Sequence, residues 1–172
     1  MTKPFVILAS SRSDGNTRSL AERVFPNHSA DFVDLNQIDI GYFSYTNSNA
    51  SDDFLPLLES VLNSRVCVLA TPLYWYTMSA QAKTFIDRLS DVLLFYQDKG
   101  RRLRGSSFAV LTTGTEPSLP ASFDQPFELT CNYLGIRFLG SYYVPCDGLD
   151  LHYERCSQSP EEFSRYLLAQ CD

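Results

Sequence analysis

The chain has 172 residues, of which 44% are hydrophobic and 20% charged, a composition that argues against a disordered or fibrous protein. This length favours a single domain, spanning residues 1–172, with one well-filled core. The net charge of -6 argues against a nucleic-acid partner, because affinity for phosphate backbones depends on clustered Lys and Arg.

The apolar runs, such as residues 66–70, are far shorter than the roughly 20 residues that a membrane helix needs, so no membrane partner is expected. The N-terminus has no extended apolar region of the kind found in secretory signals. The five cysteines form no C-x-x-C motif and no zinc-like spacing with histidine. We therefore expect reduced thiols, a cytoplasmic location and no metal site, with Cys67 serving as a small core hydrophobe.

Short apolar runs alternate along the chain with longer segments compatible with helices, a pattern typical of repeated βαβ units and a parallel sheet. The run at 30–35 alternates with polar residues, which suits a strand at a sheet edge. The five predicted strands span residues 4–9, 30–35, 65–70, 106–113 and 136–144.

Apolar residues at helical spacing are clearest in the segment 79–96, which we predict to be one helix. The last predicted helix, 159–171, has Ser159 as N-cap, Pro160 at the first helical position and Glu162 at the third. Two earlier helices are predicted to begin near Asn16 and to span 52–63.

Such a chain can wind as a doubly wound α/β sheet of five parallel strands in the order 2-1-3-4-5, with helices on both faces. Ligands of these folds bind outside the carboxyl ends of the strands, where the winding direction reverses. Unusual residues follow the first, third and fourth strands, at 10–17, 71–79 and 112–120. The polar segment 36–53 also has a length that is uncommon unless a loop is functional or mobile.

The segment 10–17, SSRSDGNT, has the residue types that bind a phosphate monoester. Backbone N–H groups at a helix start carry partial positive charge and lack acceptors, while Gly15 permits unusual backbone angles and Arg12 adds a full charge. The segment lacks the motif lysine of nucleoside triphosphatases and the G-x-G-x-x-G of dinucleotide folds. Alternatively, Asn16 is only a helix N-cap within a serine-rich turn.

The segment 71–79, TPLYWYTMS, contains three consecutive aromatic residues that cannot all enter one core from a loop. Tyr and Trp offer flat surfaces that stack on rings, although these residues could instead only cap the following helix. Together the two segments fit a ligand with a phosphate at one end and a flat ring system at the other. Flavin mononucleotide (FMN) has this form.

The stretches ASSRSDGNT and TPLYWYTMSAQAKTFIDR resemble the GSxRxxGNT and SPxYWYSMSAQLKxFIDR motifs of the flavodoxin-like NAD(P)H-dependent FMN reductases. The similarity continues through residues 34–43 and the loop after the fourth strand, so it covers most of the chain. Ala9 stands where that family has glycine and Ser11 where it has proline, which leaves the loop path open. The cysteine cluster that some relatives carry near residues 40–55 does not occur here, so no iron–sulfur centre is expected.

The resemblance implies a flavodoxin-like fold and three groups of FMN-binding residues. The FMN phosphate would be held by Ser10, Arg12, Asn16 and Thr17, with Gly15 in the same loop. The ribityl chain and the isoalloxazine would be lined, largely through backbone N–H groups, by Pro72, Leu73, Tyr74, Trp75 and Tyr76. The ring would also be approached from the loop after the fourth strand by Thr113, Gly114 and Thr115.

The resemblance implies an oxidoreductase that passes hydride from NADPH or NADH to FMN and then electrons to a small acceptor, such as a quinone, a nitro or azo compound, or free flavin. No side chain is expected to act as an acid or base. A flavodoxin-type electron carrier and a non-flavin binding module are the alternatives. A receiver domain lacks its acidic cluster here, and a serine hydrolase lacks its G-x-S-x-G elbow.

Apolar residues continue through 89–96, at the end of the predicted third helix. Exposed apolar surface of this kind often marks a subunit contact, so we expect a homodimer or homotetramer. A fully buried central helix would explain the same residues.

Overall fold

The computed structural model describes residues 3–171, which contain a single six-stranded sheet in the order β2-β1-β3-β4-β5-β6. The strands are β1 (Phe5–Leu8), β2 (Asp31–Asp34), β3 (Val66–Pro72), β4 (Ser107–Gly114), β5 (Arg137–Asp147) and β6 (Asp150–Leu151). The first five are parallel, which confirms the predicted α/β class and the winding order 2-1-3-4-5.

The predicted number of five strands was wrong, because β5 turns back into the two-residue strand β6 and pairs with it antiparallel. The fifth strand also runs to Asp147, three residues beyond its predicted end. A two-residue strand has too few positions to show an alternating pattern, so nothing in the sequence indicated β6.

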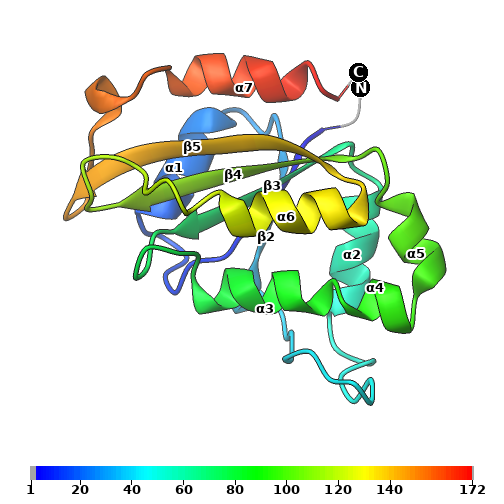
Figure 1. Ribbon diagram of the computed structural model, residues 1–172. Coiled ribbons are helices and arrows are strands. Elements are labelled where there is room, and N and C mark those ends of the chain that lie inside the picture. Colours follow the sequence, from blue (N-terminus) through cyan, green and yellow to red (C-terminus); the bar gives the residue numbers. More distant parts are fainter. Residues whose placement is uncertain (1–2, 172) are drawn as a thin grey trace.

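The helices cover both faces of the sheet, with α1 and α7 on one face and α2, α3 and α6 on the other (Figure 1). They are α1 (Asn16–Val24), α2 (Phe54–Leu62), α3 (Ala80–Arg88), α4 (Asp91–Leu94), α5 (Gln97–Arg102), α6 (Gln125–Leu134) and α7 (Pro160–Leu168). Short 3-10 turns occupy Leu35–Gln37 and Tyr153–Arg155. The capping box predicted for the last helix is present, with Ser159 and Glu162 bonding each other's backbone N–H groups.

The single helix predicted over 79–96 was wrong, because the structure divides this segment into α3 and α4. The N–H groups of Leu89, Ser90 and Val92 bond to carbonyls three residues back rather than four, which tightens and interrupts the helix. The helix α6 was not located in the sequence, although it fills the expected place between the fourth and fifth strands.

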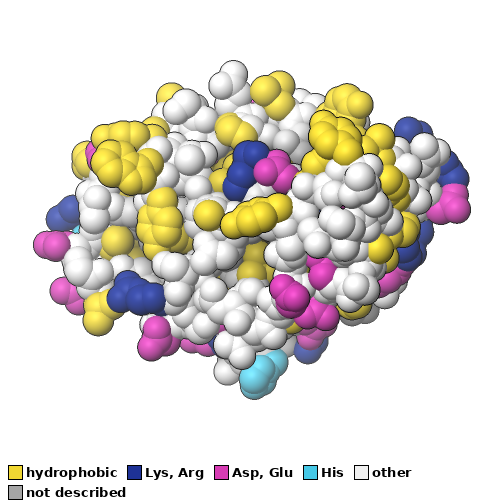
Figure 2. Space-filling model, turned by 90° about the horizontal axis from the view of Figure 1, so that it is seen from below, with side chains coloured by type: hydrophobic (Ala, Val, Ile, Leu, Met, Phe, Trp, Pro, Cys, Tyr) yellow, Lys and Arg dark blue, Asp and Glu magenta, His cyan; other side chains and the backbone are white. Residues whose placement is uncertain are grey.

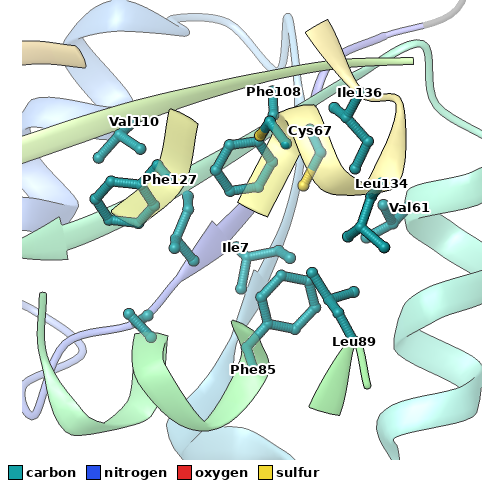
Figure 3. Packing of buried hydrophobic residues seen from close by; sticks show 14 of the residues in the cluster. Ile7, Val61, Cys67, Phe85, Leu89, Phe108, Val110, Phe127, Leu134 and Ile136 are labelled. Carbon is teal, nitrogen blue, oxygen red and sulfur yellow. The ribbon is translucent and has the colours of Figure 1, made fainter. Parts of the chain in front are cut away.

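The core has two parts, separated by the sheet. Strand β3 is buried along its whole length, and its residues alternate between the two parts, with Cys67 and Leu69 on one face and Val68 on the other. Figure 3 shows the part between the sheet and the helices α3 and α6, where Ile7 of β1 points toward Phe85 of α3. Cys67 is buried here as predicted, and burial raises the pKa of its thiol far above the ordinary value.

Within residues 3–171, no helix combines the length and the apolar character needed to cross a bilayer.

Candidate functional site

The segment 10–17, which we call the phosphate loop, connects the end of β1 to the start of α1. Within residues 3–171, the backbone N–H groups of Ser13, Asp14, Asn16 and Thr17 have no hydrogen-bond acceptor. The N-cap position of α1 is occupied by Gly15, which has no side chain to satisfy the first turn. Unpaired amides at a helix N-terminus form an anion-binding site, and a phosphate ester is the anion that such loops bind.

One side chain of the phosphate loop supplies a positive charge that has no counter-ion among residues 3–171. Arg12 is exposed and forms no ion pair within the described residues. Its guanidinium folds over Gly15, where an added Cβ would lie 3.3 Å from Arg12 Nε. The phosphate loop therefore combines amide donors with a cation that is available to an anion.

The other polar side chains of the phosphate loop contact neighbouring elements. Ser10 and Thr17 are buried, and Thr17 Oγ1 lies 3.3 Å from Thr113 Oγ1 at the end of β4. The Asn16 side chain is not the helix N-cap; its Nδ2 donates to the carbonyl of Gly148 at 2.8 Å. The backbone N–H of Asn16 has no acceptor within residues 3–171 and is available to a ligand.

Asn36, which the sequence analysis missed, holds the phosphate loop from the β2 side. Its Nδ2 donates to the carbonyl of Ser10 at 2.7 Å, and its own N–H donates to Asp34 Oδ1 at 2.9 Å. An Asx-type turn signal, Asp34 followed by Asn36, was visible in the sequence, but nothing linked it to a loop 26 residues away.

Residues 74–77 form what we call the aromatic turn, at the carboxyl end of β3. The N–H of Tyr74 donates to the carbonyl of Thr77 at 2.9 Å, and the N–H of Thr77 donates to the carbonyl of Tyr74 at 3.1 Å. Between them, Trp75 and Tyr76 have backbone φ angles of 48° and 66°, a left-handed conformation that residues other than glycine rarely adopt. Paired strain of this kind is typical of a functional site.

The aromatic turn presents flat side chains and free backbone donors together. Tyr74, Trp75 and Tyr76 are 42%, 92% and 58% exposed, which confirms that these rings do not enter the core. The N–H groups of Trp75 and Tyr76 have no acceptor in residues 3–171. A planar ligand carrying carbonyl or ring-nitrogen acceptors fits both features.

Hydrogen bonds join the phosphate loop to the aromatic turn. Ser11 Oγ lies 3.0 Å from Tyr74 Oη. Behind them, the buried Ser79 donates through Oγ to the carbonyl of Ala9 at 2.6 Å and caps α3 by accepting from the N–H of Ala82 at 3.1 Å. The N–H of Ser79 donates in turn to Thr71 Oγ1 at 3.0 Å, so one serine fixes the ends of β1 and β3 together. Sequence reasoning missed Ser79, although a serine directly before a helical segment is an N-cap signal.

The end of β4 completes the site. The N–H of Leu73 donates to the carbonyl of Thr113 at 2.8 Å, which joins β3 and β4 just before the aromatic turn. A Cβ on Gly114 would lie 2.9 Å from Cβ of Leu73, so only glycine permits this approach. The Tyr143 hydroxyl donates to the carbonyl of Glu116 at 2.7 Å, and burial raises the pKa of Tyr143 to about 12, which keeps the phenol a donor.

Most of the residues predicted to bind the ring therefore lie side by side. A small hollow is lined by Leu73, Trp75, Tyr76, Thr115 and Glu116, and Pro72 is buried behind it as the last residue of β3. Within the described part of the chain, no three His, Cys, Asp or Glu side chains gather where they could hold a metal.

The segment 38–53, which we call the clamped loop, is held in place by the buried Arg88 of α3. The guanidinium bonds Asp91 Oδ2 at 2.9 Å and the carbonyl of Gly41 at 3.0 Å, forms an ion pair with Asp52, and lies 4.5 Å from the ring centre of Phe54. Burial acts to raise the pKa of Asp52, but the hydrogen bonds from Arg88 and the backbone outweigh it and hold that pKa below its usual value.

The clamped loop places aromatic residues outward, with Tyr42 and Tyr45 at least four-fifths exposed. Figure 2, which views the molecule from the side of α3, shows hydrophobic side chains, some of them rings, at the surface among charged ones.

The chain is similar in sequence and in fold to known proteins. The YwqN protein of Bacillus subtilis (strain 168), named as an NAD(P)H-dependent FMN-containing oxidoreductase, is 29% identical in an alignment of 153 residues that covers 83% of this chain and 83% of that one. The structure of the Trp repressor binding protein from Bacillus subtilis matches with a TM-score of 0.75 and 25% identity, over 99% of this chain and 100% of that one. An FMN-dependent NADH-azoreductase from Bacillus anthracis, solved with FMN, shares the fold with a TM-score of 0.71 at 9% identity, over 99% and 100% of the two chains.

A family model described as NADPH-dependent FMN reductase matches residues 2–147. This confirms the family inferred from the two motifs, with FMN as cofactor and NAD(P)H as co-substrate. Because the match spans most of the sequence, the chain belongs to the NADPH-dependent FMN reductase family.

Proposed function

We propose that the protein is an NAD(P)H oxidoreductase that holds FMN between the phosphate loop and the aromatic turn and delivers electrons to a small acceptor, such as a quinone, a nitro or azo compound, or free flavin. The observation that carries this proposal is the set of unpaired donors. Backbone N–H groups without acceptors occur at both ends of the site, and a Ser11–Tyr74 contact of 3.0 Å joins these ends.

At the phosphate end, the N–H groups of the loop and the Arg12 guanidinium would neutralise the ester. Thr17 and Ser10 would line the same end. The hydrogen bond between the Thr17 and Thr113 hydroxyls would hold this end of the site against β4. Because these donors are already oriented by α1 and by Asn36, binding requires little reorganisation of the loop.

At the ring end, the N–H groups of Trp75 and Tyr76 would donate to acceptors on the flat ring system, while Leu73, Gly114 and Thr115 would form its wall. When bound, FMN supplies the two-electron redox chemistry and the protein supplies position and electrostatics. Amides fixed near the ring would stabilise negative charge that develops on it, which is the kind of preorganised support that favours reduction. No side chain is needed as an acid or base.

A visible spectrum of the purified protein tests the proposal directly. We expect flavin bands in the protein as isolated or after addition of FMN, and bleaching of these bands when NADPH is added anaerobically. Steady oxidation of NADPH in the presence of a quinone, an azo dye or free flavin would then identify the acceptor class. A colourless protein that binds no FMN at micromolar concentration would overturn the proposal, and bound FMN that NADPH and NADH reduce only slowly would favour an electron carrier instead.

We also propose that two copies associate through the apolar surface at α4 and α6. Leu93, Leu94, Leu129 and Tyr133 are all more than two-fifths exposed, and a hollow between α3 and α6 is lined by Leu93, Leu129 and Tyr133. Light scattering on the purified protein should give the mass of a dimer or tetramer, and Leu129→Glu should lower it. A monomeric wild-type protein would overturn this assignment.

A further inference from the structure

The hairpin formed by β5 and β6 reaches from the far side of the sheet to the phosphate loop. Strand β5 pairs with β4 as far as Pro145, and the next two residues, Cys146 and Asp147, pair with β6 instead. The turn of this hairpin carries Gly148, whose carbonyl accepts the Asn16 side chain at 2.8 Å. Residues 132 positions apart are thus joined at the first residue of α1.

The base of the hairpin is fixed, whereas its turn depends on Asn16. The N–H of His152 donates to the carbonyl of Pro145 at 2.9 Å, and Leu151 and Tyr153 pack against the core on the α1 and α7 face. At the turn, Leu149 is 71% exposed, and the Asn16 bond is the side-chain hydrogen bond that ties the turn to the rest of the described chain. Asn16 is therefore a positioning residue for the hairpin.

Beside the carbonyl that accepts the Asn16 side chain, the hairpin turn carries two carboxylates. Gly148 presents a carbonyl oxygen, and the exposed Asp147 and Asp150 flank it in the paired strands. Neither carboxylate has an ion-pair partner in residues 3–171, so no cation of the described chain neutralises their charge. An anion that extends past the phosphate loop toward the hairpin would meet like charge.

We propose that the β5–β6 hairpin, held by Asn16, restricts the site to flavins that end in a phosphate monoester and rejects flavin adenine dinucleotide (FAD). This inference rests on the proposed function. FAD continues past the first phosphate into a second phosphate and an adenosine, which must leave the phosphate loop beside α1. The hairpin turn occupies the space at Asn16, and its aspartates repel the second phosphate. FMN ends at the first phosphate and makes neither contact.

Titration of flavin-free protein with FMN, FAD and riboflavin, followed by quenching of flavin fluorescence, tests the proposal. The variants are Asn16→Ala and, as a matched control, Asn36→Ala, which also removes an amide-to-carbonyl hydrogen bond at the phosphate loop. We expect the wild-type protein to bind FMN at least about tenfold more tightly than FAD, a ratio that corresponds to about 1.4 kcal/mol of binding free energy. Asn16→Ala should reduce this ratio severalfold, whereas Asn36→Ala should weaken both flavins and leave the ratio unchanged.

Two further measurements separate the outcomes. Hydrogen exchange of a peptide covering residues 145–152 should speed up in Asn16→Ala and not in Asn36→Ala, and the double variant Asp147→Asn/Asp150→Asn should strengthen FAD binding. Equal affinity of the wild-type protein for FMN and FAD, or an unchanged ratio in Asn16→Ala despite faster exchange, would overturn the hairpin's role while leaving the proposed function intact. A wild-type protein that binds none of the three flavins would instead overturn the proposed function.

Discussion

The phosphate loop and the clamped loop follow neighbouring strands and have similar compositions, rich in Ser, Asn and Asp, yet they satisfy their polar groups in opposite ways. In the phosphate loop, the backbone N–H groups of Ser13, Asp14, Asn16 and Thr17 have no acceptor within residues 3–171, and the exposed arginine has no ion-pair partner there. In the clamped loop, backbone carbonyls and a carboxylate converge on an arginine that is 1% exposed. An unusual polar loop thus indicates a ligand only where its own protein leaves donors unpaired.

The largest effect should come from breaking the clamped loop. Replacing Arg88 with Met leaves the carboxylates of Asp52 and Asp91 buried without a cation, so the free energy of unfolding should fall by about 3–5 kcal/mol. Urea unfolding followed by circular dichroism measures this change. Lys83→Met, which removes an exposed pair with Asp87, is the control and should cost less than about 1 kcal/mol. Equal losses in the two variants would contradict the clamp.

Removing the charge of the phosphate loop should affect binding and not stability. Arg12→Ala should weaken FMN binding by about tenfold to a hundredfold, because hydrogen bonds to charged groups contribute about 1.5–3 kcal/mol. Riboflavin, which has no phosphate, should bind the variant and the wild-type protein equally. Arg18→Ala, which breaks an exposed pair with Glu22 on α1, should leave FMN binding as it is. If Arg12→Ala and Arg18→Ala bind FMN alike, the phosphate is held elsewhere.

Acid should weaken the clamped loop. Because the folded pKa of Asp52 lies below its unfolded value, near 3.9, the pair with Arg88 contributes its full stability above about pH 4 and loses it as the pH falls through the lowered folded value. Each unit of this depression corresponds to about 1.4 kcal/mol. Unfolding free energies measured from pH 6 to 3 should therefore fall less steeply in Asp52→Asn than in the wild-type protein. The exposed Asp98→Asn should retain the wild-type slope, and a wild-type slope in Asp52→Asn would show that other carboxylates control it.

The smallest effect concerns the strained aromatic turn, which resembles the phosphate loop in having free donors. Trp75→Gly should raise the free energy of unfolding by about 0.5–1 kcal/mol. The left-handed conformation costs a residue with a side chain roughly 1–2 kcal/mol, and glycine removes this cost. Part of the gain is lost because glycine also increases the conformational entropy of the unfolded chain. FMN affinity should fall in the same variant, because a stacking surface is lost. Leu149→Gly, at an exposed site without positive φ, should only destabilise the protein. A destabilised Trp75→Gly variant would mean that the turn is not strained.

Sequence patterns predicted the winding order and the parallel strands, because each depends on local alternation or on residue type. They also indicated the two segments in which the structure leaves backbone N–H groups without acceptors. They did not predict the break after Arg88, since a helical pattern does not reveal that a buried guanidinium takes carbonyls and carboxylates from a distant loop. Asn36 and Ser79 were missed for the same reason, because their partners lie 26 and 70 residues away. Contacts between strand ends are set by the sheet, and no single segment contains them.

The missing side chain at Gly114 has a consequence for how the site can change. Because the backbone of β4 touches Leu73 at this point, a methyl group there would press Leu73 outward and carry the adjoining Tyr74 with it. The two walls of the proposed ring site would therefore move together. A substitution chosen to reshape the β4 wall for a bulkier acceptor would shift the opposite wall as well, so the range of acceptors cannot be tuned from one strand alone.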